Sequence, residues 1–222
     1  MDSLSTLVPM NGNGHALWPS GEQRSGEVVA ASTTEFTAEA AELHGAPPFG
    51  SLVKVVEPGR PTIFGLVSHA ETGGLDPSRR AVARGLPPTM LDGQIYDEYP
   101  ELRDVLRTEF TARVVGFADT AGNIRHWLPP YPASMHYSVV QCPPEELVRF
   151  TERHDYLAAV LADAEGSIEL VAAAIREAAE ARGNALAYLL GAGRVVATLL
   201  SADYQRLLLI LQRIAPQAEA SA

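Results

Sequence analysis

Short apolar runs, separated by turn residues, fill the chain between residues 28 and 141. Runs of this kind, rich in β-branched and aromatic residues, predict strands. We expect six of them, over residues 28–37, 51–56, 62–70, 108–117, 124–128 and 135–141. Six short strands with frequent turns favour a small barrel or a compact sandwich.

The fourth run shows the clearest alternation of apolar and polar residues. Phe110, Ala112 and Val114 fall on one side of the strand. Thr111 and Arg113 fall on the other side. Because successive side chains of a strand point to opposite faces, this run predicts a strand with one buried face.

Glycine and proline mark the connections between the runs. The Pro58-Gly59 pair predicts a tight turn that joins the second and third strands into a hairpin. Gly65 lies in the middle of the third strand and predicts a bulge or bend there. Residues 71–98 are polar and irregular, and we interpret them as a long insertion before a short helix that begins at Pro100.

After residue 142 the apolar residues recur every three or four positions, which is typical of helices. We expect four helices joined by short loops, so that neighbours run antiparallel. The first continues from Pro143 through Leu161, the second begins at Ser167, and the fourth is capped by Ser201. The apolar stripe predicted for the third helix consists of Leu186, Leu189, Leu190, Gly193 and Ala197.

These patterns predict an α+β fold in which a small six-stranded β-barrel precedes a C-terminal α-helical bundle. The barrel is expected over residues 26–142 and the helical domain over residues 143–216. Residues 1–25 and 217–222 have the composition of tails, and we expect the first of them to be disordered. A second interpretation of the first tail is a docking peptide anchored by Trp18.

Composition and charge narrow the function classes. Hydrophobic residues make up 46% of the chain, and 17 Lys and Arg stand against 27 Asp and Glu, for a net charge of −10. Nucleic-acid binders normally need a basic surface, so this charge disfavours that class without excluding a local basic patch. We see no signal peptide and no apolar run long enough to span a bilayer, and we expect a cytoplasmic protein without a membrane partner.

Few residues offer catalytic chemistry, and we expect neither an enzyme nor a bound cofactor or metal. Lys54 is the only lysine and is not followed by Ser or Thr, so the chain has no phosphate-binding P-loop. Cys142 is the only cysteine, and we interpret it as a small buried residue in preference to a nucleophile. The enzyme alternative requires that His126 and His136 converge with a carboxylate such as that of Asp119.

Two groups of basic and aromatic residues are candidate contact sites. The predicted insertion contains a cluster of Arg79, Arg80 and Arg84. This cluster would contact an anion or a partner, or it would pair with acidic residues such as Glu98. The residues of a possible nucleic-acid face are Arg113, Arg125, Trp127 and Tyr131.

Several stretches of the sequence resemble a known family. Residues 49–55 (FGSLVKV) and 63–67 (IFGLV) look like the opening of a HAS barrel, the small β-barrel of HerA-type DNA translocases and of the α and β subunits of ATP synthase. From about residue 32 to 216 the chain resembles a family of cyanobacterial HAS-barrel proteins without an assigned activity. The stretches that carry this resemblance are STTEF, PPFGSLVKV, RTEFTARVVGF, LPPYPASMH, CPPEELVRF and LVAAAIREA.

The resemblance implies a barrel followed by helices, and it supplies no catalytic residues. In HerA-type proteins the barrel is joined to an ATPase domain, for which this sequence has no motif, and looks like an assembly and docking module. By this fold-level analogy we expect a non-enzymatic interaction module, whose partner is another copy of itself or a separately encoded ATPase or nuclease. A nucleic-acid-binding barrel protein is the alternative.

Overall fold

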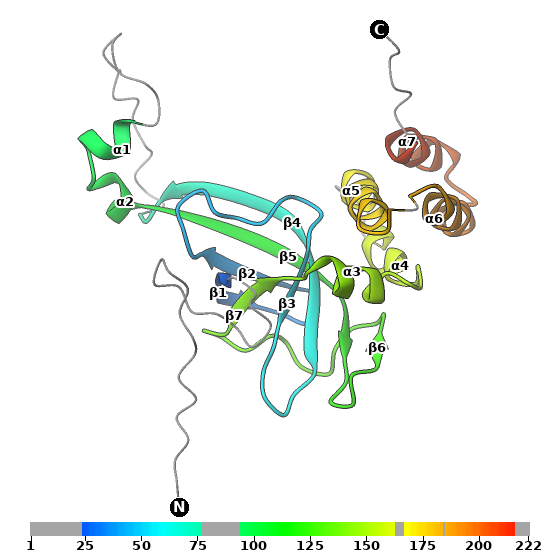
Figure 1. Cartoon of the computed structure of the whole chain (residues 1–222), viewed down its shortest axis with the longest axis horizontal. Helices are drawn as coiled ribbons and strands as arrows, with labels where there is room; N and C mark the ends of the chain where they lie inside the picture. Colours follow the sequence, from blue (N-terminus) through cyan, green and yellow to red (C-terminus); the bar gives the residue numbers. More distant parts are fainter. Residues whose placement is uncertain (1–23, 77–93, 163–166, 184, 216–222) are drawn as a thin grey trace, which may run out of the picture.

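The computed structural model describes residues 24–76, 94–162, 167–183 and 185–215 of the chain. This part has a mixed α+β fold, with a large antiparallel sheet of seven strands and several helices (Figure 1). No helix within these ranges combines the length and apolarity needed to cross a membrane. Trp18, the cluster of Arg79, Arg80 and Arg84, and nearly all residues of the two predicted tails lie outside the described residues.

The sheet contains one strand more than the sequence predicts. The strands are β1 Arg24–Ala31, β2 Glu35–Ala40, β3 Leu52–Val55, β4 Thr62–Gly74, β5 Leu106–Ala118, β6 Ile124–Arg125 and β7 Ser138–Gln141. The first predicted run, residues 28–37, is two strands joined by a turn. The hydroxyl oxygen of Ser32 accepts hydrogen bonds from the amides of Thr34 and Glu35 at 3.2 and 3.1 Å, which stabilises this turn.

The strand pairing closes on itself. Neighbouring strands follow the order β2-β1-β7-β3-β4-β5-β6, and β2 also pairs with β5. Six strands therefore form a continuous circuit, and the short β6 pairs with the end of β5. The register of β4 against β5 shifts at Phe64/Gly65 and at Val67/His69, where bulges bend the strand. The bulge predicted at Gly65 is confirmed.

Apolar side chains from the strands fill the inside of this circuit, and we call them the inner core. The alternation predicted for β5 is confirmed, because the even-numbered residues from 108 to 114 are buried and the odd-numbered residues between them are half-buried. Large members of the inner core that are at most 1% exposed include Val28, Phe36, Phe110 and Val139.

The lengths of several strands differ from the prediction. β4 continues to Gly74, which pairs with Leu106 of β5, so residues 71–74 are strand and not irregular insertion. These residues are polar or glycine and lack the apolar pattern of a strand, but they pair with β5, which is distant in the sequence. β6 and β7 are shorter than expected. β6 ends at Arg125, where the next residue, His126, turns toward the carbonyl of Phe150, and β7 begins only after His136, which has a positive φ of 64°.

The described helices are α1 Ile95–Glu98, α2 Leu102–Val105, α3 Pro144–Phe150, α4 Tyr156–Leu161, α5 Ser167–Glu180, α6 Ala185–Leu199 and α7 Tyr204–Ile214. The helix predicted after Pro100 is the single turn of α2. The cap predicted at Ser201 is wrong. The carboxylate of Asp203 caps α7 instead, by accepting a hydrogen bond from the amide of Arg206 at 3.1 Å.

The helix predicted from Pro143 through Leu161 is broken into α3 and α4. In a continuous helix the carbonyl of Phe150 would accept from the amide four residues later. Here it accepts from Nε2 of His126 at 2.9 Å. The hydroxyl of Thr151 also donates to the carbonyl of Leu147 at 2.6 Å, an arrangement that bends helices. A side chain from the strand region thus ends the helix.

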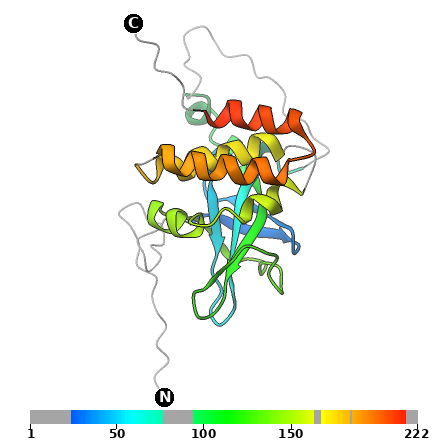
Figure 2. The same cartoon turned by 90° about the vertical axis from the view of Figure 1, so that its right-hand side faces the viewer.

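A second, outer core lies between the sheet and the helices. It joins Leu52 and Phe64 of the strands to residues of α3–α7. α5 lies behind α6 and α7 when these two helices face the viewer, and it packs against both (Figure 2). Gly50, with a φ of +91°, allows this approach, since a Cβ there would lie 2.6 Å from the Cβ of Ala173 on α5.

Candidate functional site

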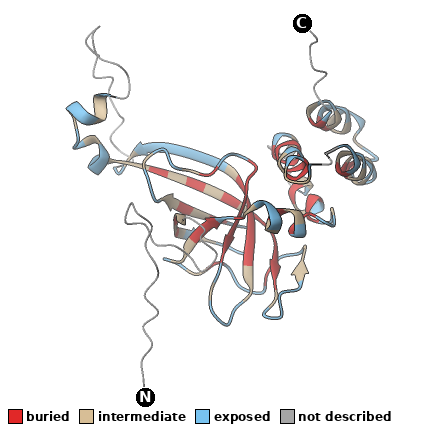
Figure 3. Ribbon diagram, viewed as in Figure 1, coloured by how far each residue is buried: buried red, intermediate tan, exposed pale blue. Residues whose placement is uncertain are grey.

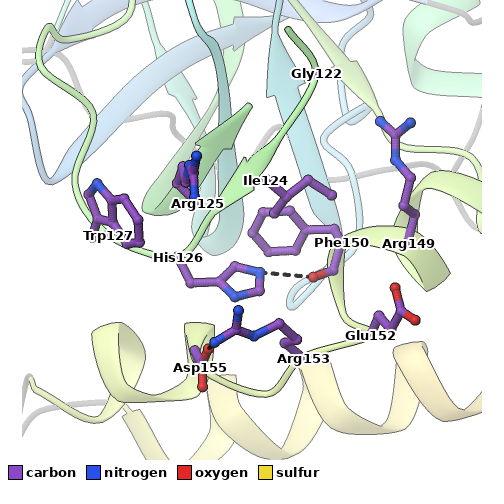
Figure 4. Close-up of a pocket in the computed structure, with 10 residues that line it drawn as sticks. All are labelled: Gly122, Ile124, Arg125, His126, Trp127, Arg149, Phe150, Glu152, Arg153 and Asp155. Carbon is purple, nitrogen blue, oxygen red and sulfur yellow. Dashed lines mark hydrogen bonds and ion pairs between the residues drawn. The ribbon is translucent and has the colours of Figure 1, made fainter. Parts of the chain in front are cut away.

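A cavity of about 320 Å³ opens where the chain after β5 meets the segment between α3 and α4 (Figure 4). Two segments that are distant in the sequence share this concave surface, which is the usual form of a ligand site. The lining residues are Gly122, Ile124, Arg125, His126, Trp127, Arg149, Phe150, Glu152, Arg153 and Asp155.

The strand-side wall of the cavity is held by the tight turn between β5 and β6. Gly116 on β5 lets the returning chain come close, because a Cβ there would collide with the carbonyl oxygen of Arg125. Asp119 closes the turn by accepting from the amides of Ala121 and Asn123 at 3.1 and 2.9 Å. Hydrogen bonds lower the pKa of Asp119 and keep it a carboxylate, and the bond from the Asn123 side chain has the largest effect. The turn therefore fixes the chain that leads into the cavity.

His126 connects the two walls. Its Nε2 donates to the Phe150 carbonyl, and the two rings meet edge to face with centroids 4.8 Å apart. Because a carbonyl oxygen only accepts, Nε2 must carry the hydrogen, and in the neutral ring Nδ1 is left as an acceptor. Burial lowers the pKa of His126 below its ordinary value, so the ring is neutral at pH 7.

A cation and an aromatic ring meet on the strand side of the cavity. The guanidinium of Arg125 lies over the ring of Trp127, 5.5 Å from its centroid. The same guanidinium is 3.7 Å from the carboxylate of Asp119. The indole of Trp127 remains 59% exposed, so its other surface is open to a ligand.

Two further arginines reach the cavity from the helical side. Arg149 is 3.9 Å from Glu146, and Arg153 is 2.5 Å from Asp155. The pair of Arg153 and Asp155 is exposed on both sides and contributes little. Arg149 is 60% exposed, but its partner Glu146 is only 16% exposed and is also bound by Lys54. With Arg125 the lining holds three guanidinium groups against the carboxylates of Glu152 and Asp155. The cavity is therefore slightly cationic on an acidic protein.

The predicted nucleic-acid face is only partly brought together. Arg125 and Trp127 share the cavity. Tyr131 instead lies under the guanidinium of Arg60, 4.8 Å from it. Arg113 is in the middle of β5, in register with β2 and β4, and does not line the cavity.

The other predicted chemical groups lie apart from one another. Nδ1 of His136 is 2.9 Å from Oε1 of Glu27, whereas His126 bonds to Phe150, so the two histidines have different partners. In the ranges that the structure covers, no group of three or more His, Cys, Asp or Glu side chains is placed to hold a metal ion. Cys142 is 8% exposed within the outer core, which confirms the prediction that it is buried.

A second candidate site is an apolar surface on the last two helices. The packing face of α6 consists of Tyr188, Ala192 and Val196. Of the five residues of the predicted α6 stripe, Leu186 and Leu190 are 58% and 55% exposed, whereas Leu189, Gly193 and Ala197 are half-buried.

α7 also carries exposed apolar side chains. Tyr204 and Leu208, one turn apart on α7, are 67% and 38% exposed. A Cβ on Gly193 of α6 would lie 3.5 Å from Leu211 of α7, so the two helices are in close contact. In Figure 3, where both helices are seen end on, each has exposed segments. We call Leu186, Leu190, Tyr204 and Leu208 the outer helical face.

Sequence reasoning missed the helical wall of the cavity. Phe150 and Arg153 were assigned to one continuous helix, which would have carried them to other positions. The only signal in the sequence is the pair of prolines that starts α3, which fixes where the helix begins and not where it ends.

No protein-family model matches the chain, and no curated protein matches it. The resemblance to HAS-barrel proteins therefore stays a prediction.

Proposed function

We propose that this chain is a non-enzymatic assembly module, made of a HAS-type β-barrel and a helical bundle, that binds a second copy of itself through the outer helical face. The observation that carries the proposal is the exposure of several large apolar side chains on α6 and α7. Soluble monomers rarely expose contiguous apolar patches, and those that occur usually mark interaction sites.

The closed strand circuit supports the barrel part of the proposal. Six strands pair in a ring around the inner core, and a ring has no open edge except where β6 is added. In HerA-type proteins, which the sequence resembles, such a barrel looks like a docking module. Fold-level likeness is a limited argument for function, so the exposed helices carry more weight.

The outer helical face has the dimensions of a helix–helix interface. α6 contains 15 residues, and at 1.5 Å per residue it is about 22 Å long. In a two-fold dimer, α6 and α7 of each copy would pack against the same pair of the other copy. This arrangement would remove Leu186, Leu190, Tyr204 and Leu208 from water.

The distribution of charge favours this face as the place where two copies meet. Residues 185–215 contain three arginines and one aspartate, a net charge of +2, so the remaining residues carry −12. Two such acidic chains repel each other over most of their surfaces. They approach at the lowest electrostatic cost through a surface that is apolar and nearly free of carboxylates.

A double substitution at the outer helical face tests the proposal. Leu190→Gln/Leu208→Gln replaces two exposed leucines, so the fold of the monomer should be preserved. We expect the wild type to elute as a dimer in size-exclusion chromatography with light scattering, and the double variant to elute as a monomer. The matched control is Val105→Gln on α2, which replaces a side chain that is 50% exposed and should leave the dimer intact.

Two other results would overturn self-association. If the Val105→Gln control dissociates as fully as the double variant, the outer helical face is not the specific interface. If the wild type is a monomer alone but co-purifies in a fixed ratio with an ATPase or nuclease, the module docks to a separate protein.

Nucleic-acid binding is the second candidate function, favoured by the stacking of Arg125 on Trp127. The net charge of −10 opposes it, and only two of the four predicted contact residues share the cavity. Titration of labelled single-stranded DNA or RNA at moderate salt tests it. Non-specific binding has dissociation constants of this order, so absence of binding at roughly tens of micromolar protein would remove this candidate.

A further inference from the structure

The cavity between residues 122–127 and 149–155 is not used by the proposed dimer. None of its lining residues belongs to α6 or α7. Its volume of about 320 Å³ lies at the lower end of the range of small-ligand pockets, roughly 300–1,000 Å³. It therefore has room for a small molecule, and its residues indicate which chemistry that molecule has.

Flat apolar groups line the cavity between the charged residues. The half-buried ring of His126 lies against Phe150, which is itself fully buried, with Ile124 beside Phe150 (Figure 4). Trp127, more than half exposed, adds a second flat surface on the strand side. Side chains of this kind favour a planar ring, which stacks on one aromatic group or meets another with its edge.

The charged groups favour an anion. Arg149 and Arg153 both line the cavity from the helical side, but in Figure 4 the guanidinium of Arg149 is directed away from that of Arg153. Arg153 is held by an exposed ion pair with Asp155. A guanidinium group binds a phosphate or carboxylate in a fork of two hydrogen bonds, which is stronger than this surface pair. An anionic group beside Arg153 would therefore replace a weak pair with a stronger one.

The neutral ring of His126 adds a requirement for a hydrogen-bond donor. Its Nε2 is committed to the carbonyl of Phe150. Nδ1 has no hydrogen-bond partner among the residues that the structure describes, and in Figure 4 it lies on the side of the ring toward Arg153. An acceptor next to a cation suits a ligand whose ring carries an N–H or O–H group near its anionic group.

We propose that this cavity binds a small anion that carries a planar ring with a hydrogen-bond donor, the chemistry shared by mononucleotides and aromatic carboxylic acids. His126 and Trp127 hold the ring, and Arg153 binds the anionic group. The site does not depend on the dimer, since the two surfaces share no residue.

The experiment uses the full chain with Trp18→Phe, so that Trp127 is the only tryptophan and its fluorescence reports on the cavity. The probes are AMP and indole-3-acetate, titrated by calorimetry, and AMP also by fluorescence. We expect saturable binding below about 1 mM, and the tighter probe identifies the anion as phosphate or carboxylate. Adenosine and ribose 5-phosphate, which lack the anion and the ring respectively, should each bind at least about tenfold more weakly than AMP.

Substitution separates the cavity from the rest of the surface. Arg153→Gln should weaken the better probe about tenfold. The matched control is Arg176→Gln on α5, which removes an exposed arginine outside the cavity and should leave affinity unchanged. The Leu190→Gln/Leu208→Gln variant should bind as well as the wild type, so failure of the dimer and failure of the site are distinguishable.

Three outcomes would overturn the site. No saturable binding of either probe up to about 1 mM would exclude a small aromatic anion of useful affinity. If the Arg176→Gln control loses as much affinity, the loss comes from the change in overall charge and not from the cavity. A single-stranded oligonucleotide that binds far more tightly than AMP, with strong salt dependence, would make the cavity part of a nucleic-acid interface instead.

Discussion

The strands and the last two helices place their apolar side chains in opposite ways. Within the closed circuit, Val28, Phe36 and Phe110 are at most 1% exposed, and the strand pairing leaves them no route to the surface. On α6 and α7, Leu190 and Tyr204 are 55% and 67% exposed although both helices also have a buried face. The apolar side chains inside the strand circuit are buried by the strands, whereas α6 and α7 have apolar side chains on their exposed face as well as on their buried face.

This difference indicates which region makes contacts with other molecules. Burial of apolar surface is the main favourable term in both folding and association, and each exposed leucine leaves part of it unused. Folding buries the apolar side chains inside the circuit. It leaves those of the outer helical face exposed, so a second copy can still bury them. We infer that the sheet provides the scaffold and the helices provide the contact.

The largest expected effect is on the stability of the strand circuit. Phe110→Ala removes a ring that is fully buried in the inner core and should lower the free energy of unfolding by about 3–5 kcal/mol. Tyr204→Ala removes a ring that is exposed on α7 and should change monomer stability by less than about 0.5 kcal/mol. Urea unfolding followed by circular dichroism, at concentrations where the protein is monomeric, measures both. Equal losses in the two variants would contradict the contrast between the regions.

The next effect concerns the ion pair that connects the two regions. Nζ of Lys54 on β3 lies 2.5 Å from Oε2 of Glu146 on α3, and the two side chains are only 11% and 16% exposed. Glu146→Gln leaves the lysine charge poorly compensated near the outer core, so the free energy of unfolding should fall by about 3 kcal/mol. Chemical denaturation at pH 7 measures this change.

The control for this pair is Lys54→Met/Glu146→Leu, which replaces both charges with apolar groups. This double variant should recover most of the stability that Glu146→Gln loses, because the desolvation cost disappears together with the attraction. If the double variant is as unstable as the single one, the pair stabilises the contact of sheet and helices by more than its charge.

The smallest effect is the pH dependence at the boundary between the two regions. Burial lowers the pKa of His126 below the ordinary value of about 6.5. Above that pH the histidine is neutral in both folded and unfolded chains and adds no pH dependence. As the pH falls below about 6.5, the unfolded chain binds a proton that the folded chain resists, so the unfolding free energy should decrease.

Variants of the two half-buried histidines separate their contributions. His154 acts in the same direction, because burial and then the charge of Arg182 lower its pKa. Thermal unfolding between pH 8 and pH 5 should show a weaker pH dependence for His126→Gln than for the wild type, and a still weaker one for His126→Gln/His154→Gln. An unchanged slope in the double variant would show that other groups control stability in this range.

The strand region was the easier part to predict from the sequence. In β5, alternation of apolar and polar residues places Phe110 on the buried face, because period two is a local property of the chain. The division of residues 28–37 into two strands was missed, because the turn depends on the hydroxyl of Ser32 and not on glycine or proline. The extension of β4 to Gly74 was missed because pairing with β5 decides it.

The helical region and the cavity were harder to predict. Two apolar faces alternate around α6, and the sequence does not indicate which of them packs inward. The hydroxyl of Tyr188 lies 3.0 Å from that of Tyr156, and this pair helps to orient the helix. The end of α3 depends on the contact of His126 with the Phe150 carbonyl, which joins segments distant in the sequence. The spacing of apolar residues along a helix predicts neither of these contacts.

The most direct test of the account is the mass of the full chain in solution. Sedimentation equilibrium of the wild type over a range of concentrations should give twice the chain mass, and Leu190→Gln/Leu208→Gln should give the mass of one chain. A wild type that remains a single chain at all concentrations would contradict the claim that the outer helical face is an interface between copies. A double variant that stays dimeric would place the interface elsewhere on the molecule.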